Sequence, residues 1–350
     1  MHQTVPSPTR RRLIAGAAAA GAIGFVPGTS RAAALTSVSG AQQWLNTPPL
    51  RPEDLKGRVV LVNIWTFSCI YCIRTLPHLR AWATKYKDQG LVVIGVQTPE
   101  FGFEKDLDNV RAALAFLGVD YPVVVDNDYR IWRAFDNNAW PTFYFIDTQG
   151  RIRYSVDGEG NYEQSERMIQ KLLSENDHAP GPTDIVTVSG EGIEAAPDFG
   201  DVHSPETYVG YAQAENFASP EAVNRDTPSL YRPASALSRN QWDLAGLWTI
   251  GGEFATLGQA PGSISYRFHA RDLHLILAPP APGHAIRFQV KLGGAPPGDA
   301  HGSDVDSRGL GTVQDARLYQ LIRQTGPIVD RTFQIEFIDP GVRAYDFTFG

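Results

Sequence analysis

The chain has 350 residues, which is too long for one ordinary domain, so we expect two. A hydrophobic content of 43% excludes a wholly disordered chain, and two cysteines are too few for a scaffold held together by disulfides. With 31 basic and 38 acidic residues the formal net charge is -7, which excludes the basic surface that nucleic acid requires of a partner.

Residues 1–34 have the pattern of an export signal. Three arginines, Arg10 to Arg12, precede a short apolar stretch that ends at Val26, and small residues occupy 32–34. This order is typical of a secretory signal, and the arginine run resembles a twin-arginine signal. A Sec signal and an uncleaved anchor are the alternatives. We therefore expect an extracytoplasmic protein of the periplasm or cell envelope. Without these residues the chain has 27 basic and 38 acidic residues, a net charge of -11.

Residues 35–178 alternate between strand-like and helix-like patterns. A lead-in that includes Trp44 is expected to pack at a sheet edge. Short apolar runs predict strands, and apolar residues spaced by three or four predict helices, the first of which Pro77 should kink. The expected strands are 59–65, 91–96, 121–125, 141–147 and 152–156, and the expected helices are 70–86, 104–117, 129–135 and 161–174. Their order predicts an α/β domain, a mixed sheet with helices on both faces.

Residues 179–204 are rich in proline, glycine and acidic residues, which predicts a linker. In 205–350 apolar and polar residues alternate in short runs between Gly/Pro turns, which predicts an all-β jelly roll or sandwich. The runs are 264–268, 273–277, 286–292, 333–337 and 345–349. Aromatic residues such as Trp242 and Trp248 are expected in its core or, as the alternative, on a binding face. The stretch 301–306 reads as a polar turn, with an oxygen-ligand metal site as the alternative.

The two cysteines, Cys69 and Cys72, stand at the junction of the first strand and the first helix. Backbone N–H groups at a helix N-terminus stabilise a thiolate, the attacking form of cysteine. We therefore predict that Cys69 lies at the exposed end and attacks a partner disulfide, and that Cys72 resolves the mixed disulfide. No metal and no cofactor besides this redox-active pair is expected. The alternatives are a structural disulfide, a zinc site with His78, two inert buried thiols or, from the Thr66-x-x-Cys69 pattern of peroxiredoxins, a peroxidase.

Several motifs resemble the thioredoxin fold. They are the strand 60–65 before the cysteines, Arg74-x-x-Pro77 after them, and Trp140-Pro141-Thr142 at the start of a later strand. These motifs resemble the exported TlpA/ResA branch of thiol–disulfide oxidoreductases. The stretches 98–101 and 126–132 are similar to the extracytoplasmic C-terminal region of DipZ proteins. That likeness implies a thioredoxin-like domain followed by a carbohydrate-binding-module-like domain.

The resemblance also implies a role for Pro141 and a set of partners. Pro141, with Trp140 before it, is the expected cis-proline that faces the active-site sulfurs, and a trans proline that merely starts a strand is the alternative. The expected partners are disulfide-bearing envelope proteins, a membrane electron donor and a glycan bound by 205–350. A glycan- or protein-binding module with a secondary redox site is the alternative function.

Three features depart from the best-known thioredoxins. Ser68 stands directly before the first cysteine where thioredoxins usually have Trp, and the nearest Trp is Trp65. Asn63 replaces a buried Asp, so proton transfer to Cys72 needs another route. Glu100, at the end of the next strand, is a candidate proton acceptor, although a solvated loop carboxylate is the favoured alternative. The Ile-Tyr pair between the cysteines lacks the His of strongly oxidising relatives, which favours a reductant.

Overall fold

The computed structural model describes residues 31–41, 43–175 and 183–350. The chain divides into two compact units at the boundary between Ser189 and Gly190, inside the predicted linker. Most of the predicted export signal, residues 1–30, lies outside the described residues. In the part of the chain that the structure describes, no helix is both long and apolar enough to cross a membrane.

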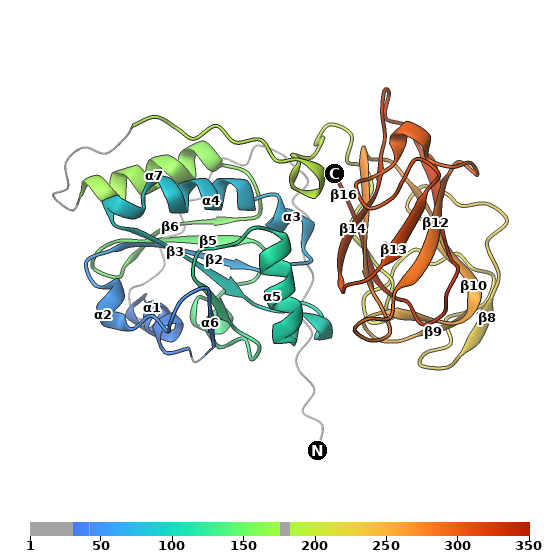
Figure 1. The fold of residues 1–350 in the computed structure, drawn as a ribbon, viewed down its shortest axis with the longest axis horizontal. Coiled ribbons are helices and arrows are strands. Elements are labelled where there is room, and N and C mark those ends of the chain that lie inside the picture. The colour runs from blue at the N-terminus through green and yellow to red at the C-terminus, as the bar shows by residue number, and fades with distance from the viewer. Residues whose placement is uncertain (1–30, 42, 176–182) are drawn as a thin grey trace, which may run out of the picture. The chain divides into compact units, whose positions relative to one another are not determined.

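The first unit is a six-stranded mixed sheet with α4 and α7 on one side and α1 and α6 on the other (Figure 1). Its strands are β1 (Trp44–Leu45), β2 (Val59–Trp65), β3 (Leu91–Gln97), β4 (Val123–Val125), β5 (Thr142–Ile146) and β6 (Ile152–Asp157). Its helices are α1 (Arg31–Ser39), α2 (Pro52–Leu55), α3 (Ile70–Ile73), α4 (Leu76–Lys85), α5 (Leu107–Phe116), α6 (Arg130–Ala134) and α7 (Tyr162–Ser174), with 3-10 turns η1 (Lys87–Gln89) and η2 (Gly102–Lys105). The predicted α/β architecture is confirmed.

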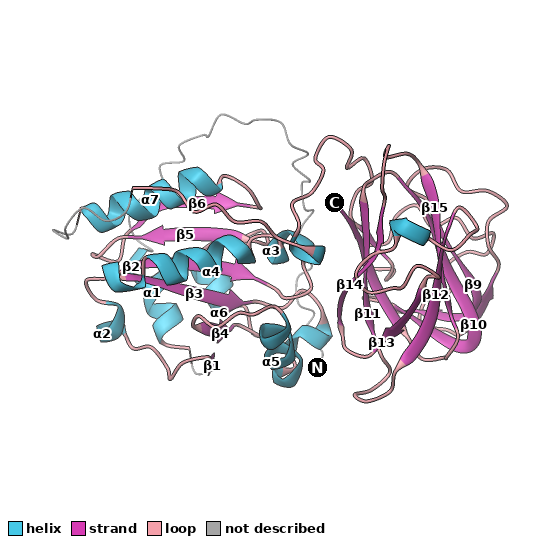
Figure 2. Cartoon of the chain, turned by 45° about the horizontal axis from the view of Figure 1, so that its top comes forward, coloured by secondary structure: helices cyan, strands magenta, loops and turns pink. Residues whose placement is uncertain are grey.

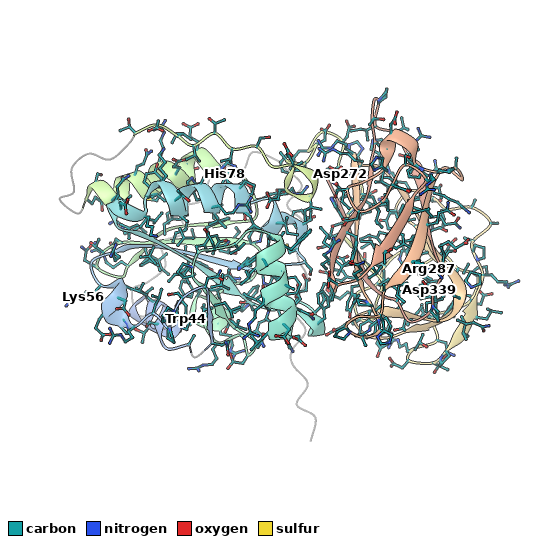
Figure 3. The ribbon with its side chains drawn as sticks, viewed as in Figure 1. Trp44, Lys56, His78, Asp272, Arg287 and Asp339 are labelled. Carbon is teal, nitrogen blue, oxygen red and sulfur yellow. The ribbon has the colours of Figure 1, made fainter. Side chains whose placement is uncertain are left out.

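The strand order is β1-β4-β3-β2-β5-β6, which Figure 2 shows from edge to edge. β2 lies in the middle and pairs in parallel with β3 and antiparallel with β5. All seven residues of β2 are buried, as the continuous apolar run predicts. The lead-in also packs as expected, because Trp44 (labelled in Figure 3) pairs with Val124 at the sheet edge.

Two predicted helices are interrupted. The first breaks between Ile73 and Leu76, and Pro77 lies in the first turn of α4, where its missing N–H removes no helical hydrogen bond. The second was expected to run without a break from Glu104. It begins as η2 and restarts as α5 after Asp106, whose carboxylate accepts hydrogen bonds from the backbone N–H groups of Asp108 and Asn109 at 2.8 and 3.4 Å. An N-cap carboxylate starts a new helix, which is why the continuous prediction was wrong here.

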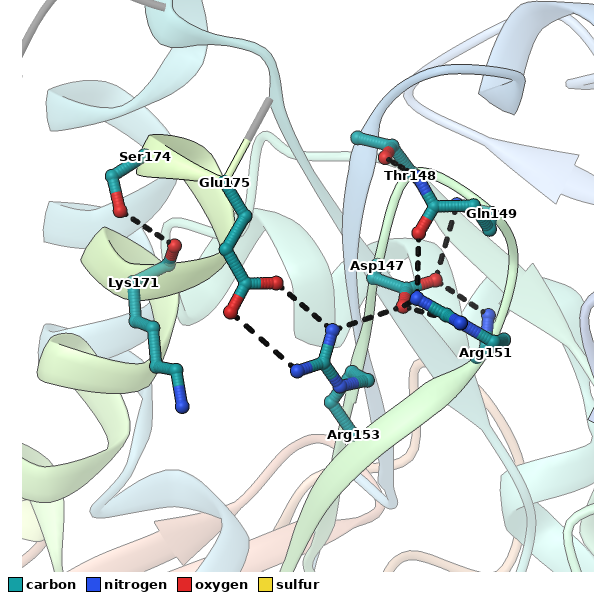
Figure 4. Close-up of polar contacts among 8 residues, drawn as sticks. All are labelled: Asp147, Thr148, Gln149, Arg151, Arg153, Lys171, Ser174 and Glu175. Atoms are coloured by element: carbon teal, nitrogen blue, oxygen red, sulfur yellow. Dashed lines mark hydrogen bonds and ion pairs between the residues drawn. The ribbon is translucent and has the colours of Figure 1, made fainter. Parts of the chain in front are cut away.

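The turn between β5 and β6 is held by ion pairs (Figure 4). Asp147 is buried and its carboxylate binds Arg151 at 2.7 Å and Arg153 at 3.2 Å. Arg153 also binds Glu175, just past the end of α7, at 2.9 Å. These contacts tie the last helix to the outer hairpin of the sheet.

Gly95, in β3, leaves space for the indole of Trp65. A Cβ at this position would lie 2.9 Å from Trp65 Nε1 and 3.3 Å from Tyr121 Cε2. We expect Gly95→Ala to lower the free energy of unfolding of the first unit by about 1–3 kcal/mol, because the packed core must shift. Urea unfolding checks this. A free energy of unfolding of the first unit that equals the wild-type value would contradict the steric explanation.

The second unit is built from one ten-stranded antiparallel sheet that surrounds a single apolar core. Its strands are β7 (Thr207–Tyr208), β8 (Ser229–Tyr231), β9 (Trp242–Ile250), β10 (Ala255–Phe268), β11 (Asp272–Ala278), β12 (Ile286–Leu292), β13 (Leu310–Val313), β14 (Arg317–Arg323), β15 (Arg331–Phe337) and β16 (Arg343–Phe349). Two 3-10 turns, η3 (Gly192–Glu194) and η4 (Gly298–Ala300), complete it. The predicted all-β domain is confirmed.

The predicted alternation places most inward residues correctly, with one exception in β16. Phe347 and Phe349 join the core cluster, but Ala344 takes the next inward place instead of Tyr345. The pairing of β11 with β16 shifts register between Leu275 and Leu277. Such a shift changes which residues point inward, and an alternating pattern alone does not reveal it.

Arg287 on β12 of the second unit forms a solvent-exposed ion pair with Asp339, which follows β15 (Figure 3). Arg287 binds Asp339 with its guanidinium at 2.8 Å, and its backbone N–H donates to the same carboxylate at 2.9 Å. These hydrogen bonds lower the pKa of Asp339 to about 2. Exposed ion pairs of this kind add little to the free energy of unfolding, so the stability of the domain comes mainly from its buried core.

Candidate active site

Both cysteines lie where β2 turns into α3. Cys69 is the N-cap residue of α3, and Cys72 lies in its single turn. Both are free thiols. The expectation of an exposed Cys69 was wrong, because this residue is only 4% exposed and Cys72 is fully buried. The loop that carries Cys69 is itself buried, since the hydroxyl of Ser68 points inward to a carboxylate described below.

The Trp140–Pro141 peptide bond is cis, as the resemblance implies. Thr142 pairs with Ile64 of β2, so Pro141 lies beside the end of the strand that leads to the cysteines. The segment is anchored on both sides: Trp140 Nε1 donates to Thr98 O at 3.0 Å, and Gly158 N donates to Pro141 O at 2.7 Å. The structure therefore brings the cysteines and the predicted cis-proline segment to the same end of the sheet.

Asn63 and Trp65 lie on β2 and are fully buried. Neither the amide of Asn63 nor the indole nitrogen of Trp65 has a hydrogen-bond partner among the residues that the structure describes. A buried polar group without a hydrogen-bond partner lowers the free energy of unfolding. Asn63 has no titratable proton, which leaves the question of proton transfer to other side chains.

Glu100 lies after β3, as expected, and its side chain is half-buried. The contact that ties it to the site is made by its backbone, because Glu100 N donates to Glu104 Oε2 at 2.5 Å. Its role as a proton acceptor stays a prediction. The carboxyl that reaches the cysteine loop belongs instead to Glu104, four residues later.

Sequence reasoning missed Glu104 as a site residue and placed it only at a helix start. Its side chain is fully buried, and its Oε1 accepts a hydrogen bond from Ser68 Oγ at 2.5 Å. Phe101 N donates to Oε2 at 2.9 Å. Burial raises the pKa of Glu104, and hydrogen bonds from Ser68 and Thr66 act in the opposite direction. The sequence did offer one signal for a buried carboxyl: Glu104 follows two phenylalanines, Phe101 and Phe103, at the start of a predicted helix.

On the other side of α3, a buried ion pair joins the helix to the loop after β6. Arg74 Nε lies 3.2 Å from Glu159 Oε2, and the two side chains are 2% and 8% exposed. Burial raises the pKa of Glu159, and the charge of Arg74 opposes that shift. Glu159 follows Gly158, whose N–H binds Pro141 O, so the pair holds the cysteine helix and the proline segment to one loop.

His78, on α4 (Figure 3), packs flat against Tyr162, with ring centroids 3.7 Å apart and an interplanar angle of 12°. No group of three or more metal-ligating side chains is found in the described ranges. The zinc alternative therefore gains no support from His78. Burial lowers the pKa of this histidine to about 4, although the charge of Glu166 opposes the shift.

The depressed pKa of His78 predicts an acid-sensitive fold. An unfolded histidine takes up its proton near pH 6.5, whereas the folded one does so near pH 4. The unfolded state therefore binds more protons in this window, and stability should fall as the pH drops from about 6.5 to about 4. Thermal unfolding across this range checks this prediction. His78→Phe keeps a ring against Tyr162 and should flatten the pH dependence, and an unchanged slope contradicts the assignment.

Most of the large aromatic residues of the second unit lie in its core, whereas Tyr208 and Tyr211 are partly exposed. Trp242, Trp248, Tyr266 and Tyr319 are at most 1% exposed, so they do not form a binding face. In the stretch 301–306, the carboxylates already have hydrogen-bond donors: Asp304 binds Arg317, and Asp306 binds Arg308. This matches the polar-turn interpretation of the stretch.

Comparison with known proteins assigns both units. Residues 41–155 match the AhpC/TSA family, and residues 204–350 match a family described as "Thioredoxin like C-terminal domain". Protein DipZ of Mycobacterium tuberculosis is 37% identical over 245 residues, 69% of this chain and 34% of DipZ. Thiol-disulfide oxidoreductase YkuV of Bacillus subtilis is 26% identical over 41% of this chain and 96% of YkuV. Thiol-disulfide oxidoreductase ResA of Bacillus thuringiensis is 28% identical over 34% of this chain and 66% of ResA. The chain thus spans about a third of the length of DipZ.

Proposed function

Because the first unit is a thioredoxin-like domain homologous to thiol–disulfide oxidoreductases, we propose that the whole chain is an exported enzyme that reduces or exchanges disulfides of envelope proteins. The observation that carries the proposal is the position of the two cysteines at the β2–α3 junction, beside the cis Trp140–Pro141 segment. A cysteine nucleophile at a helix start, close to the end of a strand, suits exchange with a disulfide in a partner polypeptide.

The reaction proceeds in two exchanges. The Cys69 thiolate attacks one sulfur of a partner disulfide, a bond forms between these sulfurs, and the other partner sulfur leaves as a thiolate that takes up a proton. The Cys72 thiolate then attacks the Cys69 sulfur. The Cys69–Cys72 bond forms, and the second partner sulfur leaves and is protonated. The partner gains two electrons and two protons, and the enzyme pair is oxidised.

Turnover requires a reductant that restores the two thiols. We propose a membrane electron donor for this step, since the pattern of residues 1–34 predicts that the protein works outside the cytoplasm. Residues 204–350 would then hold the enzyme near its substrates by docking to an envelope protein. A glycan is a weaker proposal for this unit, because most of its large aromatic side chains, the groups that stack on sugars, lie in its core.

A peroxidase is the second candidate, and the match of residues 41–155 to the AhpC/TSA family favours it. Thr66 stands three residues before Cys69, as in peroxiredoxins. Its hydroxyl, however, is buried and accepts a hydrogen bond from Gln97 Nε2 at 3.2 Å. Consumption of hydrogen peroxide with dithiothreitol as reductant would support this second activity, and no consumption removes it.

Insulin reduction by dithiothreitol tests the main proposal. The protein should accelerate insulin precipitation well above the rate with dithiothreitol alone, and no acceleration contradicts the proposal. The reduction potential of the cysteine pair then gives the direction of electron flow. A value near about -270 mV supports a reductant, whereas a value near about -120 mV would make the protein an oxidant.

A further inference from the structure

A buried carboxyl group is hydrogen-bonded to the residue directly before the attacking cysteine. Glu104, in η2, is fully buried and binds Ser68 although 36 positions separate the two residues. Consecutive Cα atoms lie 3.8 Å apart, so the carboxyl lies within about 9 Å of the Cys69 Cα. The neighbouring Lys105 and Asp106 are exposed, so water screens their charge, whereas Glu104 is out of contact with solvent.

The groups around this carboxyl are hydrogen-bond donors. Oε2 faces two backbone N–H groups, those of Glu100 and Phe101, which can only donate. Oε1 faces the hydroxyl of Ser68, and the hydroxyl of Thr66 also binds the carboxyl. Donors of this kind favour the ionised form, whereas burial favours the neutral form and raises the pKa of Glu104.

A purely structural role does not account for Glu104 well. Its bond to Phe101 N caps η2, which has only four residues. A helix cap stabilises the fold by less than the free energy that burying a carboxylate costs. A neutral side chain could also accept the same hydrogen bond. Among its other contacts, the bond to Ser68 leads to the loop that carries Cys69.

We propose that Glu104 is a positioning residue that fixes Ser68, and that its carboxylate, within about 9 Å of the Cys69 Cα, disfavours the Cys69 thiolate and biases the cysteine pair towards a reducing potential. This inference rests on the proposed function. Stabilising the thiolate of such a pair makes it a stronger oxidant, so an anion nearby has the opposite effect. The inference also supplies a cause for the reducing character that the sequence suggested.

The test compares Glu104→Gln and Ser68→Ala with the wild type. Glu104→Gln removes the charge and keeps the size of the side chain, and Ser68→Ala removes one donor that keeps the carboxyl ionised. In a Cys72→Ser background, alkylation of Cys69 by iodoacetamide at pH 7 should be about threefold faster in Glu104→Gln, because a tenfold larger thiolate fraction is partly offset by lower nucleophilicity. Ser68→Ala should shift the rate in the same direction by less.

The reduction potential gives the second readout. The effect on the equilibrium with dithiothreitol should grow as the pH rises through the range in which an ordinary thiol ionises and be fully visible near about pH 10. Glu104→Gln should shift that equilibrium constant about tenfold towards the reduced pair. This shift corresponds to a rise of about 30 mV in the reduction potential of the pair. Glu166→Gln is the matched control, because Glu166 is also a fully buried carboxyl but lies on α7. It should lower thermal stability and leave the potential unchanged.

Unchanged alkylation and potential in a folded Glu104→Gln protein overturn the inference and leave the proposed function intact. If that variant does not fold, Ser68→Ala decides the question in the same way. An equal shift in Glu166→Gln also overturns the inference, because the effect would then not be specific to the cysteine loop. A wild-type pair that forms no disulfide in any redox buffer would contradict the proposed function itself.

Discussion

Cys69→Ser is expected to reduce insulin-disulfide reduction by more than about a hundredfold, to the rate of dithiothreitol alone. Serine keeps the size of the side chain at the N-cap of α3, so the fold should survive. The oxygen that replaces the sulfur is not ionised near neutral pH and cannot form the mixed disulfide. Insulin precipitation followed by turbidity, with thermal unfolding to confirm folding, measures the effect.

Cys72→Ser should behave differently, although it is the other half of the pair. Cys69 can still attack, but no second thiolate releases the partner, so the mixed disulfide should accumulate. Mass spectrometry of the variant after mixing with a disulfide-bearing peptide detects the adduct. Retention of wild-type turnover by either variant would remove the cysteine pair from the mechanism. Accumulation of the adduct on Cys72 in the Cys69→Ser variant would exchange the two assigned roles.

The second large effect concerns stability. Glu166 on α7 is fully buried and accepts hydrogen bonds from Tyr86 Oη at 2.6 Å, from Trp82 Nε1 at 3.0 Å and from Lys85 Nζ at 3.0 Å. Val186 N donates to the same carboxylate at 2.9 Å. Burial alone would raise the pKa of Glu166, but these hydrogen bonds outweigh it and the pKa is lowered. One carboxylate thus joins α4, α7 and the chain that follows α7.

Glu166→Ala is expected to destabilise the first unit by about 3–5 kcal/mol, because it leaves the buried donors of Trp82 and Tyr86 without their acceptor and removes one of the two carboxylates that bind Lys85. Urea unfolding checks this, with a probe confined to the first unit, since a chain of two units need not unfold in one step. The matched control is Glu163→Ala on the same helix. Glu163 is 69% exposed and binds Arg167 at 3.1 Å, so its loss should cost less than about 1 kcal/mol. Similar losses for both variants would contradict the importance of burial.

The charge arrangement at the site differs from that of the best-known thioredoxins. The strand position that holds a buried acid there is an uncharged amide in this chain, Asn63, and it finds no partner among the described residues. A buried acid is nevertheless present, but it comes from the segment after β3 and reaches the loop of Cys69 through Ser68. The two unusual positions, Asn63 and Ser68, are therefore related: one removes the usual carboxyl, and the other binds a different one.

The sequence by itself determined the parts of this protein that depend on local patterns. The bounds of β2 follow from the apolar run of residues 59–65, and the cysteines lie at its junction with a helix because the pattern changes there. The order of the elements and the all-β second unit also follow from periodicity. The resemblance to the thioredoxin fold implied the cis bond at Trp140–Pro141, where proline makes the cis form cost little.

Only the tertiary structure decided which distant side chains meet at the site. The bond between Glu104 and Ser68 spans 36 positions, and the pair of Arg74 and Glu159 joins two segments that no motif connects. The burial of Cys69 was likewise not visible in the sequence. Local propensity depends on neighbours along the chain, whereas these contacts depend on which faces of the sheet and which loops pack together. A hydrogen bond to a buried carboxyl forms only after that packing has excluded water.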